Sequence, residues 1–376
     1  MLENFFRDNF KNYWKNIDKT IFISFLLLFV LGIFFSFAST SSLAGERLNK
    51  DYYFFFSKHL IFAIFSIFLM ILISSIQLDF FKKMLIPIFL ILLTTLVLVL
   101  FFGVEVKGSK RWLNFFFFRF QPVEFVKPFF IVIIAKILSK DNLTTSNTSF
   151  FLSFLVLIIL CVILLNQPDL GQAVLLILSW LAIVFISGIK LIYIFSFFGL
   201  TISSVVGLLF LFSNKFAYIL KRFEAFFDPI KGEHSQSSKA LDAIREGGLT
   251  GQGMGEGTLK DTVPEAHTDY IVSVIVEEFG SLISIFLICI FLYISFRIIK
   301  FALLEEEKFI KISLCGLASL LIFQTFIHIG VNVSLLPTTG MTLPFLSYGG
   351  SSMLGSAMLA GIILNLTKKR FLNENF

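Results

Sequence analysis

Apolar runs long enough to cross a lipid bilayer recur along this chain, and they constrain its fold more than any other feature. A transmembrane helix needs roughly 20 predominantly apolar residues. Because backbone polar groups in lipid must be satisfied within each segment, the runs predict helices and not strands. The fold class predicted is an all-α polytopic membrane protein with ten transmembrane helices. The windows are 20–40, 59–77, 84–103, 121–138, 149–166, 170–188, 191–212, 270–299, 309–331 and 343–367.

Composition supports this fold class. The 376 residues are 57% hydrophobic and 15% charged, with a mean hydropathy of +0.89. A soluble protein of this length has no core large enough to bury so much apolar surface. Cys161, Cys289 and Cys315 fall inside apolar runs, so we interpret them as small buried hydrophobic residues and not as metal ligands or disulfide partners.

The windows predict a single integral membrane domain that covers residues 1–376. A cytoplasmic N-terminal segment, 1–19, precedes the first window, and a cytoplasmic tail, 368–376, follows the last. The one long polar stretch, 213–269, is predicted to be a large extracytoplasmic loop between helices 7 and 8. The first window is expected to be an uncleaved span, because a signal peptide has a shorter apolar core of roughly 7–15 residues.

Several basic residues fall in the predicted outer loops, although Lys and Arg near membrane spans usually lie on the cytoplasmic side. This placement indicates an anionic ligand, with contact to acidic lipid headgroups as the alternative. Nucleic acid is not indicated by the net charge of +6, because the basic residues are scattered among loops. The residues in the two short outer loops are Arg47, Lys50, Lys58, Lys107, Lys110, Arg111 and Arg119.

Glu124 and Lys127 lie at the start of the fourth window, beside Pro122, which suits a first helical turn. Their i,i+3 spacing places both side chains on one face of the helix. Each charge costs roughly 2.5–3.5 kcal/mol near the centre of a transmembrane helix, so the two should pair or line a polar cavity. The sequence leaves both alternatives open: a structural ion pair, or a cavity used by a substrate.

Two further polar patterns have structural explanations. Gln324, His328 and Asn332 recur every four residues along the ninth window and form a stripe that can join helices by hydrogen bonds. Asp169, within Gln167-Pro168-Asp169-Leu170-Gly171, is expected to cap the sixth helix.

Glycines alternate in the large loop at Gly251, Gly253, Gly255 and Gly257. The pattern lacks the Gly-Lys-Ser/Thr of a Walker loop and the preceding strand of a dinucleotide fingerprint. We interpret it as a flexible outer loop whose backbone approaches a ligand closely. No pattern in the chain offers a credible set of metal ligands.

The segment from Pro337 to Ser352 leads into the last helix and contains two prolines, three glycines and several hydroxyl-bearing side chains. These residues should break a helix at membrane depth. Irregular backbone is tolerated there only if it is buried in protein or lines a water-filled cavity.

With these motifs the chain resembles the SEDS family (shape, elongation, division and sporulation) of peptidoglycan polymerases. The resemblance covers roughly residues 20–367. Gly255–Lys260, Pro264–Asp269 and the segment from Pro337 look more like the division members of the family than the elongation members. Lys239 and His328 stand where many members carry glutamine and asparagine. The motifs are Lys107–Trp112, Arg119–Glu124, Gln167–Gly171, Pro264–Asp269 and Pro337–Ser352.

The resemblance implies a glycosyltransferase that polymerises lipid II in the bacterial cytoplasmic membrane during septal wall synthesis, with both termini cytoplasmic. It implies a class B penicillin-binding protein and other divisome membrane proteins as partners. The family's essential loop aspartate falls on Asp269. The substrate-binding residues expected are Lys58, Lys107, Lys110, Arg111, Arg119, Glu124, Lys127, His267, Ser347, Gly349 and Ser351.

In such a reaction the 4-hydroxyl of N-acetylglucosamine attacks an anomeric carbon and expels a lipid diphosphate. Asp269 is the predicted general base, a role worth ~10²–10⁴-fold, and a reference pKa of about 3.9 keeps an aspartate ionised at neutral pH. An N-cap of the eighth helix is its structural alternative and is compatible with that role. The outer cations would stabilise the leaving group. No cofactor is evidently required, although Mg²⁺ or Mn²⁺ could share this task.

Other functions fit parts of the pattern. A transporter that flips lipid II would suit the ten helices, the intramembrane charges and the broken last helix. However, no inverted repeat is visible, and the polar residues concentrate on one side of the membrane. An elongation-type polymerase would share the chemistry. A scaffold without catalysis would leave Asp269 and the outer cations unexplained.

Overall fold

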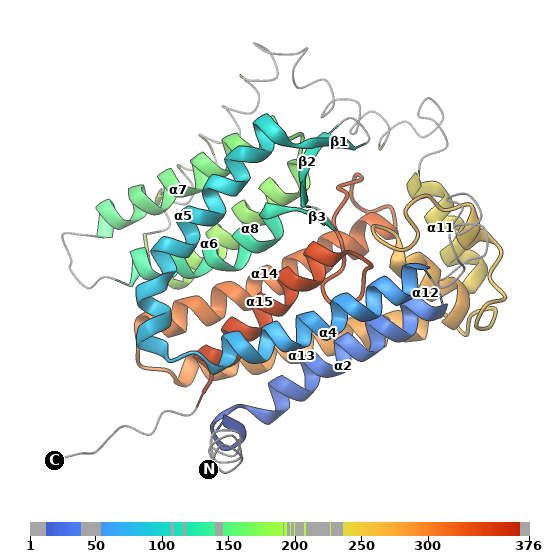
Figure 1. The fold of residues 1–376 in the computed structure, drawn as a ribbon, viewed down its shortest axis with the longest axis horizontal. Coiled ribbons are helices and arrows are strands. Elements are labelled where there is room, and N and C mark those ends of the chain that lie inside the picture. Colours follow the sequence, from blue (N-terminus) through green and yellow to red (C-terminus); the bar gives the residue numbers. More distant parts are fainter. Residues whose placement is uncertain are drawn as a thin grey trace.

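The computed structural model describes residues 13–38, 54–106, 109–115, 118–139, 146–190 and 236–368, with a few isolated residues between 191 and 235. In this part of the chain the structure is a bundle of long helices (Figure 1). The predicted window 191–212 and the first part of the large loop lie outside the described residues. The prediction of ten helices therefore stays a prediction.

Helices occupy nine of the ten predicted windows, which confirms a helical, multi-pass architecture. Six of the helices are long and apolar enough to cross a membrane, and α8 and α15 are shorter apolar helices. All the described α-helices, in chain order, are α2 (Lys19–Ala38), α4 (Phe54–Ser75), α5 (Leu78–Phe102), α6 (Pro122–Leu138), α7 (Ser146–Asn166), α8 (Leu170–Ile186), α11 (Gln236–Gly247), α12 (Ile271–Phe279), α13 (Ser281–Leu304), α14 (Lys308–Asn332) and α15 (Gly350–Leu366).

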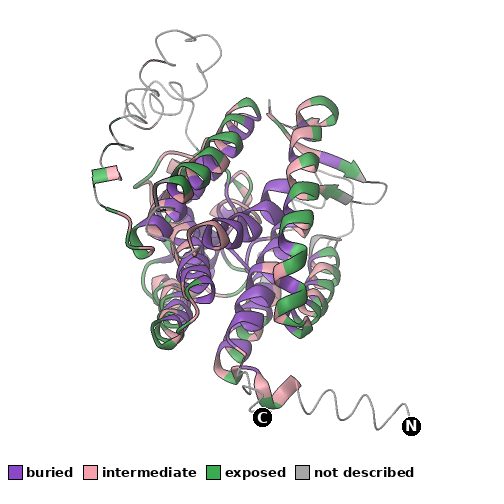
Figure 2. Cartoon of the chain, turned by 90° about the vertical axis from the view of Figure 1, so that its left-hand side faces the viewer, coloured by how far each residue is buried: buried purple, intermediate pink, exposed green. Residues whose placement is uncertain are grey.

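Burial separates central helices from peripheral ones (Figure 2). Within the apolar windows, 72% of α14 is buried but only 28% of α4 and of α5. Large apolar side chains such as Phe65, Phe68 and Phe296 are exposed on the outer helices. Since such exposure is costly in water, these surfaces fit contact with lipid. The central helix α14 packs against α6, α8 and α13.

The two ends of the described chain meet at one end of the bundle. The Lys368 ammonium lies 5.5 Å from the centroid of the Tyr13 ring, and the Tyr13 hydroxyl is 2.6 Å from Ser74 Oγ. The strands and α11 lie at the opposite end (Figure 1). The location of both termini in the cytoplasm stays a prediction.

A three-stranded antiparallel sheet connects α5 and α6, and the sequence analysis did not predict it. Its strands are β1 (Val104–Val106), β2 (Ser109–Phe115) and β3 (Phe118–Phe120). The apolar windows exclude strands only where lipid surrounds the backbone, and this segment lies beyond the ends of both helices. There, aromatic and β-branched residues favour a sheet. The sheet is relevant to function because Arg111 lies on β2.

The predicted eighth window is two helices, α12 and α13, which is a correction. They are separated at Gly280, whose φ of +84° is in the left-handed region that favours glycine. A Cβ atom there would lie only 2.1 Å from the carbonyl oxygen of Leu249. The break is therefore built into the packing between the helix ends and the glycine-rich loop.

That loop satisfies the backbone groups that the break exposes. The amides of Gln252 and Gly253 donate to the carbonyls of Glu277 and Glu278, at 2.9 and 3.0 Å. In return, the Ser281 amide at the start of α13 donates to a loop carbonyl at 3.0 Å. Among the alternating glycines, Gly251 lies against the protein's own backbone, because a Cβ atom there would be 2.3 Å from the Glu278 carbonyl oxygen. Close approach of this loop to a ligand stays a prediction.

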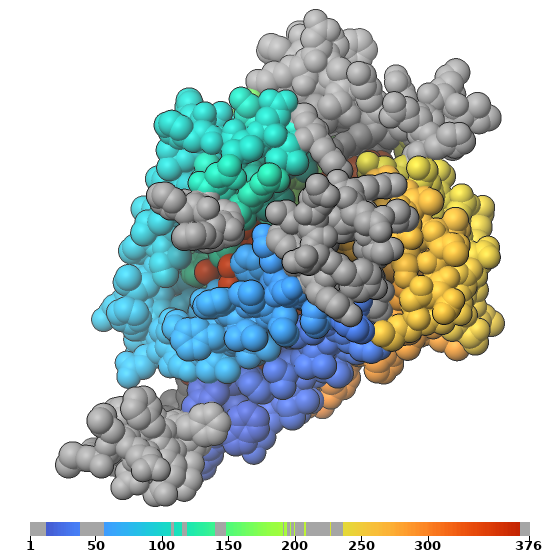
Figure 3. Space-filling view, turned by 45° about the vertical axis from the view of Figure 1, so that its right-hand side comes forward, coloured from blue at the N-terminus to red at the C-terminus, as the bar shows by residue number. Residues whose placement is uncertain are grey.

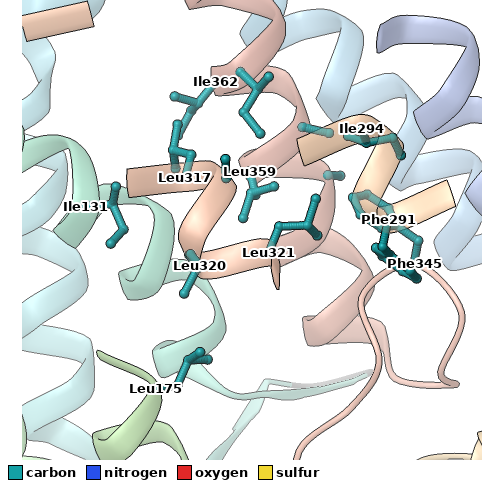
Figure 4. Close-up of a cluster of buried hydrophobic side chains, with 14 of the residues drawn as sticks. Ile131, Leu175, Phe291, Ile294, Leu317, Leu320, Leu321, Phe345, Leu359 and Ile362 are labelled. Carbon is teal, nitrogen blue, oxygen red and sulfur yellow. The ribbon is translucent and has the colours of Figure 1, made fainter. Parts of the chain in front are cut away.

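The last predicted window also starts later than expected, because α15 begins at Gly350 and not at 343. The part of the preceding irregular segment from Met341 to Ser347 is mostly buried in protein, whereas Gly340 is exposed. The Phe345 ring of this segment lies 5.3 and 5.1 Å from the rings of Phe25 and Phe29. Figure 4 shows Phe345 beside Phe291 in the apolar cluster that α13, α14 and α15 form. This anchor fixes the segment that carries part of the candidate site.

Candidate functional site

The end of the large loop is fixed by three hydrogen bonds to consecutive carbonyl oxygens. The carbonyl of His267 accepts from the Tyr348 amide at 2.9 Å. The carbonyl of Thr268 accepts from Ser347 Oγ at 2.7 Å, and that of Asp269 accepts from Asn332 Nδ2 at 3.0 Å. Because all three bonds use the main chain of the loop, they hold its backbone without using the Asp269 carboxylate.

Asp269 and Arg111 come together around Gly340. The position that a Cβ atom at Gly340 would occupy is 3.6 Å from Asp269 Oδ2 and 3.5 Å from Arg111 Nη1. Gly340 has a φ of +69°, so glycine also suits its backbone conformation. The structure thus places a carboxylate and a guanidinium from distant parts of the chain next to the same point of one backbone turn.

Arg111 is held in this position by the turn between α7 and α8. Its Nε donates to the Gln167 carbonyl at 3.3 Å, and its Nη2 donates to the Pro168 carbonyl. The Arg111 Nε also lies 3.7 Å from Asp169 Oδ2, and the two side chains are 11% and 1% exposed. An ion pair so far removed from water fixes the guanidinium more firmly than a surface pair would.

The role predicted for Asp169 was therefore wrong. Asp169 occupies the N-cap position of α8, but its side chain makes no capping hydrogen bond. Its carboxylate faces Arg111 instead. Gly171 in the same turn packs closely on Thr339, since a Cβ atom there would lie 2.7 Å from the Thr339 Cβ. The turn thus contacts both Arg111 and the segment that carries Gly340.

Asp269 is also not the N-cap of the eighth helix, because that position belongs to Tyr270. The amide of Ser273, in the first turn of α12, donates to Asn332 Oδ1 at 3.2 Å. The structural alternative considered for Asp269 is thus wrong.

The remaining predicted cations lie elsewhere. Lys58, Lys110 and Arg119 are exposed, and Lys107 lies outside the described residues. On β2 and β3, Lys110 faces Glu105 across the strand pair and Arg119 faces Asn114. Successive side chains of a strand point to opposite faces, so Lys110 is directed away from the face that carries Arg111.

The predicted hydroxyl and glycine positions form the frame of the site. Ser347 Oγ accepts from the Leu343 amide at 2.8 Å besides donating to the loop. Ser351 Oγ accepts from the Gln121 amide and donates to the Arg119 carbonyl, both at 3.0 Å. Gly349 is the N-cap residue of α15. These contacts give the two serines a structural role, and contact with a substrate stays a prediction for all three residues.

Glu124 and Lys127 form a buried ion pair with an N–O distance of 2.8 Å. Gln172 Nε2 donates to Glu124 Oε1 at 2.9 Å, and Lys127 Nζ donates to Gln324 Oε1 at 3.2 Å. With side chains only 5% and 3% exposed, both charges are paired and hydrogen-bonded inside the bundle. This geometry favours the structural alternative, and a role in substrate binding stays a prediction.

Changing one member of this pair should destabilise the protein strongly. Lys127→Met leaves a buried carboxylate without its cation, which costs about 3–5 kcal/mol, measured as the free energy of unfolding in detergent. The double variant Glu124→Gln/Lys127→Met should recover most of that loss and retain catalytic activity. A double variant that folds but has lost activity would instead favour a role in substrate binding. The partly exposed pair Lys82–Glu307 is the control, worth about 1 kcal/mol or less.

The polar stripe on α14 forms hydrogen bonds to other helices, as predicted, through Lys127 on α6 and the Ser273 amide on α12. It also bonds irregular backbone. Gln324 Nε2 donates to the Thr342 carbonyl at 3.0 Å, and His328 Nδ1 lies 2.8 Å from the Met341 carbonyl. Asn332 completes the stripe by contacting the carbonyl of Asp269. The stripe thus holds Gly340 and Asp269 against the same helix.

His267 precedes Asp269 by two residues and is half-buried. Burial lowers the pKa of its imidazole from the usual 6.5, because removal from water disfavours the charged ring, while Glu265 and Asp261 partly oppose this shift. The ring is therefore neutral at pH 7. It does not supply a permanent positive charge for an anionic ligand.

The surface of the bundle is hollowed between α4 and the teal part of the chain (Figure 3). Consecutive helices α4 and α5 diverge, because α4 packs against α15 and α2 whereas α5 packs against α6. In Figure 3 red atoms of the C-terminal part of the chain are visible between the blue surface of α4 and the teal surface above it. Within the described residues, no group of three or more His, Cys, Asp or Glu side chains could hold a metal ion.

Sequence reasoning missed two residues of the site. Gly340 was noted only as a helix breaker, and Asn332 only as part of a polar stripe. The positive φ of Gly340 and the backbone partners of Asn332 depend on tertiary contacts, so no local signal could have assigned them.

Residues 18–371 match the model of a family of cell cycle proteins, FtsW/RodA/SpoVE. A protein of Caulobacter vibrioides, named probable peptidoglycan glycosyltransferase FtsW, is 35% identical over 359 residues, which cover 95% of this chain and 91% of the relative. A protein of Haemophilus influenzae with the same name is 33% identical over 375 residues, covering 95% and 94%.

Solved structures share the fold. A peptidoglycan synthase complex, described as coordinating polymerization and crosslinking, matches 93% of this chain and 97% of its own chain with a TM-score of 0.76 at 22% identity. The Rod shape determining protein RodA of Thermus thermophilus matches 93% and 96% with a TM-score of 0.68 at 23% identity.

Proposed function

The chain belongs to the FtsW/RodA/SpoVE family of cell cycle proteins, and on this basis we propose that it is a peptidoglycan glycosyltransferase that polymerises lipid II during septal wall synthesis. The observation that carries the proposal is the meeting of Asp269 Oδ2 and Arg111 Nη1 around Gly340. A base and a cation in one place are what transfer of a sugar from a lipid diphosphate requires.

Asp269 acts as the general base. Its carboxylate accepts the proton from the 4-hydroxyl of the acceptor N-acetylglucosamine while that oxygen forms a bond to the anomeric carbon of the donor. The bond between that carbon and the diphosphate oxygen breaks at the same time. The fixed backbone of residues 267–269 supports this role, since a base must be held within hydrogen-bond reach of its proton.

Arg111 stabilises the negative charge that develops on the leaving diphosphate. A guanidinium can donate two parallel hydrogen bonds to a phosphate group, and it needs no reorganisation if it is already oriented. The contacts to Gln167, Pro168 and Asp169 supply that orientation. The exposed Lys58, Lys110 and Arg119 would contribute at longer range.

Displacement of an α-linked diphosphate to give a β-linked glycan inverts the anomeric carbon. Inversion needs one base and no covalent intermediate with the enzyme, so Asp269 suffices. A divalent cation bound to the diphosphate itself could share the task of Arg111. The proposal does not depend on a metal.

The substrate's lipid chain would enter from the membrane between α4 and α5, where these helices diverge. The enzyme would lie in the cytoplasmic membrane at the division septum, with the strands and α11 outside the cytoplasm. There it would work beside a class B penicillin-binding protein that crosslinks the new glycan, together with other divisome membrane proteins. A peptidoglycan synthase complex among the structural relatives supports such a partner.

The purified chain and a class B penicillin-binding protein, incubated with labelled lipid II and penicillin, should produce glycan ladders on a gel. Penicillin blocks crosslinking, so ladders report polymerisation alone. Absence of ladders, together with movement of lipid II across vesicle membranes, would overturn the proposal in favour of a transporter.

A further inference from the structure

The Asn332 side chain forms a hydrogen bond to the main chain of Asp269. Its Nδ2 donates to the Asp269 carbonyl at 3.0 Å and to the His328 carbonyl, one turn earlier in α14, at 2.9 Å. Its Oδ1 accepts from the Ser273 amide at 3.2 Å. One fully buried amide thus connects α14, the first turn of α12 and the end of the large loop.

The His328 contact fixes the orientation of the Asn332 amide group. An amide side chain can otherwise rotate about its last torsion, and the bond within α14 holds Nδ2 and Oδ1 in defined positions. Those positions then define where the Asp269 carbonyl and the Ser273 amide must lie. Ser347 and Tyr348 hold the two preceding carbonyls, but neither bond reaches residue 269.

We propose that Asn332 is a positioning residue that orients the Asp269 carboxylate through the Asp269 main chain. This inference rests on the proposed function of Asp269 as the general base. Only two side-chain torsions separate the Asp269 backbone from its carboxylate, so a fixed carbonyl limits where the carboxylate can lie. A displacement of about 1 Å at a reacting group can lower a rate by ~10²-fold.

Asn332→Asp separates positioning from a simple capping role. The new carboxylate keeps the acceptor for the Ser273 amide, and a negative charge is favourable at the start of α12. It cannot donate to the Asp269 carbonyl. We therefore expect a kcat lowered by about 10–100-fold and a KM for lipid II within about 2-fold of wild type. The melting temperature should fall, because the new carboxylate is buried without a cation. If Asn332 only capped α12, this variant would keep its kcat.

Asn332→Leu controls for the added charge, because it removes all three hydrogen bonds with an apolar side chain of similar size. We expect the same loss of kcat as for Asn332→Asp, again with a lower melting temperature. A loss of kcat in the Asp variant alone would show that charge repulsion, and not loss of the donor, is responsible, and it would overturn the proposal.

Asn365 on α15 offers a matched structural control. It is buried as Asn332 is, and its Nδ2 donates to the carbonyls of Ile73, Ser74 and Ile76 at 3.1, 3.4 and 2.6 Å. These contacts lie at the end of α4, beside the described chain ends and away from Asp269 (Figure 1). Asn365→Asp and Asn365→Leu should lower the melting temperature and leave kcat within about 2-fold of wild type.

The outcomes distinguish this inference from the proposed function. If Asp269→Asn abolishes polymerisation but the Asn332 variants lose no more kcat than the Asn365 variants, the positioning role is wrong and the base assignment stands. If Asp269→Asn remains active, the proposed base and the inference that rests on it are both wrong.

Discussion

Replacing Asp269 with asparagine is expected to abolish glycan ladders while leaving the fold intact. The amide has nearly the same shape as the carboxylate but cannot accept a proton from the acceptor hydroxyl. A loss of about 10²–10⁴-fold in kcat is expected, the usual contribution of a general base. The hydrogen bonds that hold residues 267–269 use main-chain carbonyls, so they survive the substitution. Gel analysis of polymerised lipid II measures the activity, and thermal unfolding measures the fold.

Asp242→Asn is a suitable control for this variant. Asp242 lies on α11 in the same loop region, and its side chain is 59% exposed beside Arg245. It should keep wild-type activity and stability. A folded Asp269→Asn variant that retained kcat within about 3-fold of wild type would exclude Asp269 as the base, since a lost base costs at least ~10²-fold.

Arg111→Met should lower both activity and stability. Loss of a preorganised cation opposite the leaving diphosphate is expected to reduce kcat by about 10²–10³-fold. The substitution also leaves the Asp169 carboxylate, 1% exposed, without its cation. Removing one member of a buried pair costs about 3–5 kcal/mol in the free energy of unfolding. Steady-state kinetics with lipid II and unfolding in detergent measure the two effects separately.

The double variant Arg111→Met/Asp169→Asn separates catalysis from folding. Without the buried carboxylate, the stability of the double variant should recover toward wild type, but kcat should stay low. Recovery of both would mean that Arg111 acts only by holding the turn between α7 and α8. Arg245→Met, at an arginine that is 71% exposed, should change the free energy of unfolding by less than about 1 kcal/mol.

Local sequence patterns were sufficient for the helices. The windows of about 20 apolar residues matched described helices because a helix in lipid satisfies its own backbone groups. The exceptions were places where another segment supplies hydrogen bonds. Gly280 divides the predicted eighth helix because the glycine-rich loop bonds both ends of the break. The strands around Arg111 were missed because they lie beyond the helix ends, where that constraint does not apply.

The candidate site was only partly predictable in the same way. Asp269 and Arg111 could be selected as chemical groups, but their proximity required the turn at Gly340. Asp169 was assigned to a helix cap because capping is the usual role of an aspartate at a helix start. Its pairing with Arg111 depends on a strand that lies more than fifty residues earlier in the chain.

The sequence by itself determined the helical membrane architecture, the family motifs and the residue types available for chemistry. These properties follow from hydrophobicity and from residue identity, which are local. Only the tertiary structure decided which carboxylate faces the site, which cation lies beside it and which amide holds its backbone. Those relations arise where β2, the turn between α7 and α8, α14 and the segment before α15 pack together, and hydrogen bonds between distant segments leave no periodic signal in the sequence.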